Sequence, residues 1–204
     1  TFMPGTSLVT FNSATAQAIN GTDTTQYFHS ITVNKSANTL SVGGSTTALV
    51  LSGNHTITAG TFNIGTAANM YVGGDWTMTG GSFTNTGSTV TMNGSAVQNM
   101  RSTGAFDNLK IDNAPGYANL TGDITINGLL TFASGIIHTN AYHVILGSSA
   151  TTTGAGATSY IYGNEKINIP NTLAPSYTFE IGDASKYAPV QVAFAGTTSG
   201  SGSI

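Results

Sequence analysis

The segments TITAGTF, from Thr56 to Phe62, and TMTGGSF, from Thr77 to Phe83, lie 21 residues apart and follow one pattern. Each alternates Thr with an apolar residue, continues through glycine and ends on Phe. Such alternation is typical of a β-strand with one buried face, and glycine supplies the backbone conformation of a turn. A strand-turn-strand unit that recurs at a constant spacing indicates a solenoid. The offset predicts that Phe62 and Phe83 lie in neighbouring turns, about 4.8 Å apart along the axis.

A longer phrase also occurs twice, about 80 residues apart. GTSLVTFNSATAQAI starts at Gly5 and GSTVTMNGSAVQNM starts at Gly87, and Gln17 in the first copy corresponds to Gln98 in the second. FHSITVN follows the first copy and FDNLKID follows the second. A looser version of the shorter unit, TFASGII, has Gly135 at the glycine position. We interpret all these repeats as units that each stack on a copy of the same unit.

Strand signals run through the whole chain, because short segments rich in Val, Ile, Thr and aromatic residues alternate with Gly, Asn and Ser. We predict an all-β fold, a right-handed parallel β-helix or β-solenoid. Its corners need a positive φ, which glycine adopts readily. The expected corner residues are Gly5, Gly60, Gly81 and Gly135. The Asn-Gly pairs at 20–21, 93–94 and 127–128 also fit two-residue hairpins, so tandem antiparallel β-sandwiches are the alternative.

Two regions differ along the chain. Residues 1–154 carry the internal repeats, in which about 6–80 recurs as 87–147. From 155 to 204 charged residues and prolines become more frequent and the spacing fades. We predict a solenoid over 1–154 and, over 155–204, a terminal β module that covers its open edge or a continuation of the solenoid.

The amino-acid composition excludes several classes of partner and site. Charged residues make up only 6% of the chain and the few basic ones are scattered, so we expect no nucleic acid partner. Cysteine is absent, which excludes disulfides and thiolate metal sites. No apolar run is long enough for a membrane-spanning helix. Because the chain starts at Thr1 and stops within a Gly/Ser phrase, we expect a fragment or mature segment of something longer.

Few residues have the pattern of a reactive site. His138 and His143 are close in sequence, but a metal site needs further ligands that are not nearby. FDNLKID gathers Asp107, Lys110 and Asp112, yet the equivalent FHSITVN lacks the carboxylates, which favours a solvated surface. Nucleophile-elbow, P-loop and dinucleotide motifs are absent from the sequence. We predict no catalytic, cofactor-binding or metal-ligating residue; a β-helix polysaccharide-degrading enzyme is the least favoured alternative.

Threonine and tyrosine side chains are the candidates for contact with a ligand. Thr alternates along the repeated strands, and a flat Thr array is suited to carbohydrate or ice. Tyr rings in SYIYG lie on one face and can stack on a sugar, although packing beneath the terminal module is the alternative. The candidate contact residues are Tyr160, Tyr162, Thr56, Thr58, Thr77 and Thr79.

In their order, these phrases resemble the repeats of very large surface proteins and adhesins of Bacteroidota. The resemblance rests on GTSLVTFNSATAQAI…FHSITVN, on GSTVTMNGSAVQNM…FDNLKID and on INGLLTFASGII. YTFEIGDASKYAPVQVAF, from Tyr177 to Phe194, is similar to the segment that often ends such repeat blocks. The resemblance covers most of the chain and implies export through the type IX route and a place at the cell surface. It transfers no binding residue.

The sequence therefore predicts a non-catalytic structural or adhesive repeat module of a large cell-surface or filament-forming protein, with no cofactor. Expected partners are copies of the chain, adjacent repeats of the parent protein and surface glycans. The alternative is a carbohydrate- or ice-binding module. In the first strand, Val9 and Phe11 are expected to join the core, while Leu8 and Thr10 point away from it.

Overall fold

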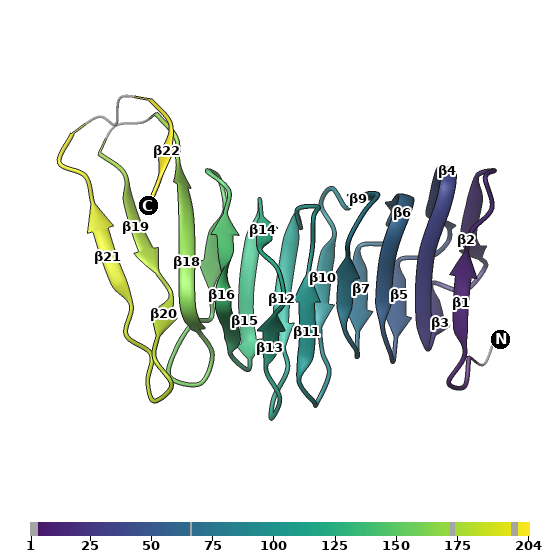
Figure 1. The fold of residues 1–204 in the computed structure, drawn as a ribbon, viewed down its shortest axis with the longest axis horizontal. Helices are drawn as coiled ribbons and strands as arrows, with labels where there is room; N and C mark the ends of the chain where they lie inside the picture. Colours follow the sequence, from purple (N-terminus) through teal and green to yellow (C-terminus); the bar gives the residue numbers. More distant parts are fainter. Residues whose placement is uncertain (1–3, 66, 172–173, 197–199) are drawn as a thin grey trace.

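The computed structural model describes residues 4–65, 67–171, 174–196 and 200–204. This part of the chain is a parallel β-solenoid of about eight turns, and it contains no helix. The turns follow one another along a single axis from β1 at one end to β20 and β21 at the other (Figure 1). The predicted parallel β-solenoid is confirmed. The β-sandwich alternative is wrong because β10 and β11, its expected hairpin, each pair in parallel with strands of other turns. The described part has no helix long and apolar enough to cross a membrane.

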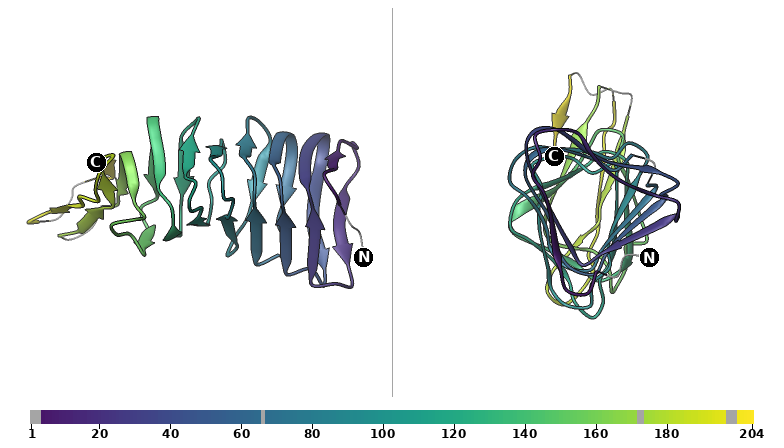
Figure 2. Two further views of the ribbon diagram at one scale, coloured as in Figure 1. Left: turned by 90° about the horizontal axis from the view of Figure 1, so that it is seen from below. Right: turned by 90° about the vertical axis from the view of Figure 1, so that its right-hand side faces the viewer.

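Each turn of the solenoid has three faces, which give the tube a three-sided outline when it is viewed end on (Figure 2). Face 1 consists of β1 (Leu8–Phe11), the first part of β4 (Ser30–Gly44), the first part of β6 (His55–Asn63), β8 (Trp76–Met78), β11 (Gln98–Arg101), β13 (Ala118–Leu120), the first parts of β16 (Ile137–Leu146) and β18 (Ile161–Ile169), and β20 (Ile181–Gly182).

Face 2 follows face 1 in each turn, and face 3 completes the turn. Face 2 consists of β2 (Gln17–Gly21), the second parts of β4 and β6, β9 (Ser82–Thr84), β14 (Ile124–Ile126) and the second parts of β16 and β18. Face 3 consists of β3 (Thr25–Phe28), β5 (Ala48–Leu51), β7 (Asn69–Val72), β10 (Thr89–Met92), β12 (Asn108–Asp112), β15 (Leu129–Ser134) and β17 (Thr151–Thr153). Because four strands run round the corner, faces 1 and 2 together with β22 (Gly202–Ser203) form one 13-stranded sheet, whereas face 3 is a separate seven-stranded sheet.

The core is a column of inward side chains that stack from turn to turn. Ile57 pairs with Val33 on one side and with Met78 on the other, and all three are at most 1% exposed. Phe62 pairs with Phe83 in the next turn, with ring centroids 5.8 Å apart and nearly parallel planes. The predicted register of these two residues is confirmed. Burial of apolar area along the whole axis supplies the main favourable term of folding.

Corner glycines let successive turns approach closely. The expected corner residues all have a positive φ: Gly5 +53°, Gly60 +81°, Gly81 +72° and Gly135 +88°. A Cβ atom on Gly81 would lie 2.3 Å from the carbonyl oxygen of Gly60 in the turn beside it. At this corner glycine is therefore required both by the backbone conformation and by the space between turns.

The two copies of the long phrase do not stack on each other. The first copy forms β1 on face 1 and leads into face 2, whereas the second forms β10 on face 3 and leads into face 1. The prediction of direct stacking is wrong for this phrase. The phrase encodes a type of corner, which the chain uses at two different positions around the tube.

The glutamine in the second copy of the phrase organises its corner. Gln98 is 1% exposed, and its Oε1 accepts hydrogen bonds from the Gly94 N–H at 2.8 Å and from Nδ2 of Asn113. Its Nε2 donates to the carbonyl oxygen of Val72 at 2.8 Å and to that of Gly74. One side chain thus satisfies polar groups of three successive turns.

The first copy repeats this arrangement with a charged partner. Oε1 of Gln17 accepts from the Ser13 N–H at 3.3 Å and from Nζ of Lys35 at 2.9 Å. Lys35 occupies the position of Asn113, is 1% exposed, and also donates to the carbonyl oxygens of Ser13 and Thr15 at 2.6 and 2.7 Å. Three oxygen acceptors compensate the burial of this ammonium group.

The strand pairing changes along the region 155–204. β18 and β20 continue the parallel stack of face 1. The chain then becomes antiparallel: β19 (Ser176–Phe179) pairs with β21 (Val190–Ala193), and β22 (Gly202–Ser203) pairs with the end of β18. At the opposite end Val9 and Phe11 are half-buried, Leu8 and Thr10 are exposed, and β1 pairs with β4 on one side only among the described residues.

Replacing the buried glutamine tests whether the corner device stabilises the solenoid. We expect Gln98→Met to lower the free energy of unfolding by about 3 kcal/mol, because buried donors and acceptors lose their partners. Gln17→Met, in the half-exposed first turn, should cost about 1 kcal/mol. Urea denaturation followed by circular dichroism measures both. Equal losses, or no loss at Gln98, would contradict the assigned role.

Candidate functional site

A ladder of threonines runs along the outer surface of face 1 in the first four turns. Thr10 pairs with Thr32, Thr32 with Thr56, and Thr56 with Thr77. The ladder ends in the fifth turn, where Arg101 is the partner of Thr77. The structure thus brings together two of the predicted contact residues and adds two more threonines to them.

Thr58 and Thr79 widen this ladder in the third and fourth turns. Both are exposed and each follows an inward residue, Ile57 or Met78. The Thr58 hydroxyl donates to the carbonyl oxygen of Val33 at 3.4 Å. The complete T-x-T pattern therefore occupies two turns, and its outer hydroxyl groups form a small flat array.

The two predicted tyrosines lie in different environments. Tyr160 is 2% exposed, and its hydroxyl donates to the carbonyl oxygen of Asp183 at 2.7 Å beneath the terminal segment. Tyr162 is 37% exposed and meets His138 edge-on, with centroids 4.9 Å apart. The segment 159–161 is buried at every position, so simple alternation does not apply there. Of these two predicted tyrosines, only Tyr162 exposes its ring to solvent.

Polar and aromatic side chains replace threonine on the outer surface of the later turns. Asn99 donates to the carboxylate of Asp75, Asn119 donates to Oδ1 of Asn99 at 2.9 Å, and Asn140 donates to Oδ1 of Asn119 at 2.9 Å. Sequence reasoning missed this amide ladder, although Asn99 and Asn119 each precede an inward apolar residue at equivalent positions. Such a ladder fixes outward side chains relative to one another across four turns.

The two histidines that are close in sequence have separate roles. His138 stacks on Tyr117 with centroids 4.1 Å apart, and partial burial lowers its pKa. His143 lies past the corner, where Asp123 Oδ1 accepts from its backbone N–H at 2.9 Å and lies 3.4 Å from its Nδ1. Among the residues that the structure describes, no three His, Asp or Glu side chains are placed to hold a metal ion.

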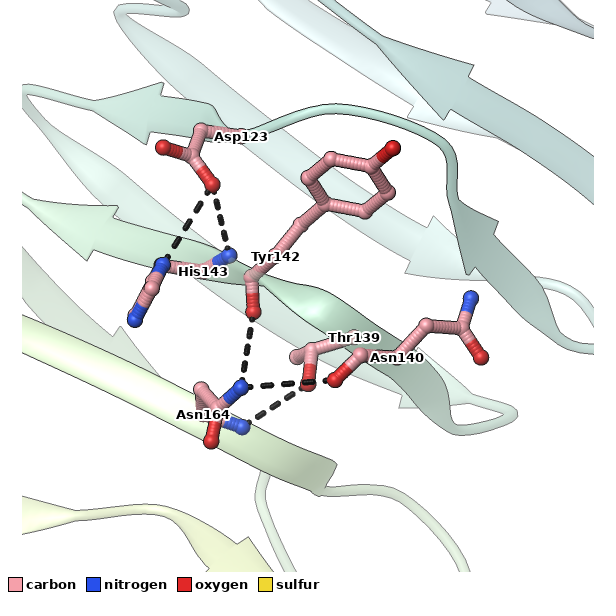
Figure 3. A network of polar contacts seen from close by, with 6 residues as sticks. All are labelled: Asp123, Thr139, Asn140, Tyr142, His143 and Asn164. Atoms are coloured by element: carbon pink, nitrogen blue, oxygen red, sulfur yellow. Dashed lines mark hydrogen bonds and ion pairs between the residues drawn. The ribbon is translucent and has the colours of Figure 1, made fainter.

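The corner loop of β16, residues 139–143, is held from the turns on both sides (Figure 3). Asn164 donates through its backbone N–H to Oγ1 of Thr139 at 2.8 Å and through Nδ2 to the carbonyl oxygens of Asn140 and Tyr142 at 3.3 and 3.1 Å. On the other side Asp123 holds His143. These contacts fix the backbone that carries the Tyr142 ring.

Beside this loop lies an open hollow of about 340 Å³, called here the Tyr142 hollow. It lies between the fifth, sixth and seventh turns, near the corner where face 1 leads into face 2. Its lining residues are Arg101, Ser102, Thr103, Thr121, Gly122, Asp123 and Tyr142. It combines an aromatic ring, a guanidinium group, a carboxylate and hydroxyl groups.

The carboxylates of FDNLKID serve the solenoid itself. Asp107 accepts from the Gly87 N–H across one turn. Asp112 forms an ion pair with Lys110 at 3.3 Å and accepts from the Ser134 hydroxyl at 2.9 Å. Their positions are those of a partly solvated surface and of corner contacts.

A pair of glutamates lies where the solenoid meets its terminal segment. Oε2 of Glu165 accepts from the backbone N–H of Glu180 at 2.7 Å, and the Glu180 carboxylate accepts from the hydroxyls of Thr152 and Tyr187. Burial, with a smaller contribution from the Glu180 charge, raises the pKa of Glu165 to about 7. Burial together with the Glu180 contact raises the pKa of Tyr187 to about 12. The polar contacts of this cluster join β17 and β18 of the solenoid to the terminal segment that carries Glu180 and Tyr187.

One core histidine was missed by sequence reasoning. His55 is fully buried, stacks on Trp76 with centroids 4.4 Å apart, and burial lowers its pKa to about 3. The alternation in NHTITA places His55 on the same side of the strand as Ile57, and this pattern could have predicted that it points into the core.

Comparisons with protein-family models, with curated proteins and with solved structures found no match.

The raised pKa of Glu165 predicts how stability depends on pH. Its folded pKa of about 7 exceeds the ordinary value of 4.5, so the folded state is favoured by protonation. The stabilisation by this proton is complete below pH 4.5 and is lost as the pH rises through 7. Over this range the free energy of unfolding falls by at most about 3 kcal/mol. Glu165→Gln should remove this dependence between pH 5 and 8. Urea unfolding at several pH values measures it, and an unchanged slope in the variant would refute the assignment.

Proposed function

We propose that this chain is a non-catalytic structural and adhesive module of a large extracellular protein, at the cell surface or in a filament. The observation that carries the proposal is the core column that continues through the successive parallel turns. A tube of this kind holds its two ends at a fixed separation, because each turn is bonded to its neighbours along the axis. The outward side chains remain free to vary for contact.

The surface chemistry is consistent with this role. Thr, Ser, Asn and Gly make up about half of the chain, so its surface is polar with little charge repulsion between repeated units. The resemblance to surface proteins and adhesins of Bacteroidota supports export by the type IX route and a cell-surface location. The partners that we propose are copies of the chain or adjacent repeats of its parent, together with surface glycans.

The free edge of β1 is the proposed point of axial contact. Its backbone N–H and C=O groups on one side have no strand partner among the described residues, and its inward residues Val9 and Phe11 are only half-buried. A further turn placed there would extend the ladder by several hydrogen bonds, each contributing about 0.5–1.5 kcal/mol. It would also cover the exposed end of the core column.

Lysines on the edge strand test the axial contact. We expect the wild-type chain to associate end to end at high concentration, and the pair Leu8→Lys and Thr10→Lys to reduce the association constant at least tenfold by charge repulsion. The matched control carries the same two charges at Thr77 and Thr79, in an interior turn. Sedimentation velocity measures all three proteins. A strictly monomeric wild type, or equal reduction in the control, would overturn the proposal.

The threonine ladder supports a second candidate function, which is binding of ice or carbohydrate. Thr56, Thr58, Thr77 and Thr79 form its widest part and lie on adjacent strands with the short spacing of a β-sheet. Regularly spaced hydroxyl and methyl groups present a flat surface that matches an ordered layer of ligand hydroxyls or water.

The Thr77→Lys and Thr79→Lys pair also tests this second function. We expect the wild type to show thermal hysteresis or retention on a glycan array, and the variant to lose it because two long charged side chains interrupt the array. Leu8→Lys with Thr10→Lys should leave such binding intact, because those positions lie outside the widest part. Wild-type protein without hysteresis and without retention would exclude the Thr array as a binding site.

A further inference from the structure

We propose that the Tyr142 hollow binds the ring of a neutral saccharide. The inference names a ligand class for the adhesive part of the proposed function and rests on that part alone. At about 340 Å³ the hollow has the size of a small ligand site. The side chains that line it come from three successive turns, so the site exists only when these turns are stacked.

Tyr142 supplies the apolar surface for such a ring. The side chain is 39% exposed, and its ring points away from the backbone contacts of its loop (Figure 3). The loop beneath it is already fixed by Asn164 and Asp123, so little conformational freedom is lost when a ligand binds. Gly163 is part of this support, since a Cβ atom there would lie 2.0 Å from Oγ1 of Thr139. A rigid aromatic ring suits the C–H face of a pyranose.

Arg101 supplies hydrogen-bond donors from the fifth turn, two turns away from Tyr142 along the axis. Its stem crosses Gly122 so closely that a Cβ atom there would lie 2.6 Å from the Arg101 Cγ. Within the part of the chain that the structure describes, the guanidinium group forms no hydrogen bond and no ion pair. It is an exposed planar group of donors in a surface that has few charges.

Asp123 supplies the complementary acceptor. Both contacts of its carboxylate with His143 are made by Oδ1, so Oδ2 forms no hydrogen bond among the described residues, and the side chain is 53% exposed. One cation and one anion in the same hollow disfavour a strongly charged ligand. They match a neutral ligand with hydroxyl groups, because each hydroxyl both accepts from the guanidinium and donates to the carboxylate. A saccharide ring combines such hydroxyls with an apolar face.

The neighbouring hollows lack this combination. The one beside Tyr117 and His138, about 320 Å³, has no Asp, Glu, Lys or Arg in its lining. The one beside His138 and Tyr162, about 180 Å³, has none either. The Tyr142 hollow is therefore distinguished from both by the charged groups in its lining. Tyr162, with 37% exposure, provides a matched aromatic control on the next turn.

Affinity electrophoresis in gels containing hydroxyethyl cellulose, xylan, galactomannan or polygalacturonate tests the proposal on the intact chain. We expect retention by at least one of the three neutral polysaccharides. For that polysaccharide Tyr142→Ala should weaken binding about tenfold, Arg101→Gln about five- to tenfold, and Tyr142→Phe less than about twofold because the ring remains. Tyr162→Ala should also change binding less than about twofold.

Three outcomes would overturn the inference: no retention by any neutral polysaccharide, retention by polygalacturonate alone, or equal losses in Tyr142→Ala and Tyr162→Ala. Thermal melts of all variants establish that they remain folded, which the exposure of these side chains leads us to expect. Sedimentation of the same samples reports axial association separately. A wild-type chain that associates axially but is retained by no neutral polysaccharide would refute the saccharide site and leave the structural role standing.

Discussion

No turn of this solenoid can bury its own apolar side chains, and this constraint governs the rest of the structure. Ile31, Leu49 and Leu109 are fully buried only because the turns on both sides cover them. The backbone ladder and the core column therefore depend on each other: the ladder sets the spacing at which side chains stack, and stacking holds the strands in register. Corners must then keep the same close spacing. Gly81 against the Gly60 carbonyl, and Gln98 among three turns, are two solutions to that requirement.

Sequence reasoning succeeded where the length of a turn is constant and failed where it changes. Phe62 and Phe83 could be placed because their strands, one turn apart, alternate in the same phase. Turn length elsewhere varies: Ile31 pairs with His55, 24 residues on, whereas Ala118 pairs with Ile137, 19 residues on. Two copies of one phrase can therefore arrive on different faces. The repeated phrase predicts the geometry of the local corner. The number of residues between the two copies determines the face on which each copy lies.

The candidate site was less predictable than the fold, for a related reason. Arg101, Asp123 and Tyr142 belong to three successive turns, and none stands in a motif with another. Their convergence depends on the register of face 1 and on the corner loop of β16 that Asn164 supports. Tyr160 shows the opposite error. Simple alternation would place it on the same outer face as Tyr162. It lies instead in an irregular buried segment, where its hydroxyl donates to the carbonyl oxygen of Asp183 in the terminal region.

The separation between inward and outward positions explains how such a scaffold can acquire function without losing stability. Inward positions are restricted by stacking on both sides, whereas outward positions are restricted only by their neighbours along the surface. Face 1 accordingly changes from a threonine ladder to an arrangement of Asn, His, Tyr and Arg while its inward column stays buried and mostly apolar, with His55 and Gln98 as polar members. The corners show the same freedom. Lys35 and Asn113 differ in charge, size and reach, yet each donates to the equivalent glutamine, because the acceptor geometry defines the corner and several donors satisfy it.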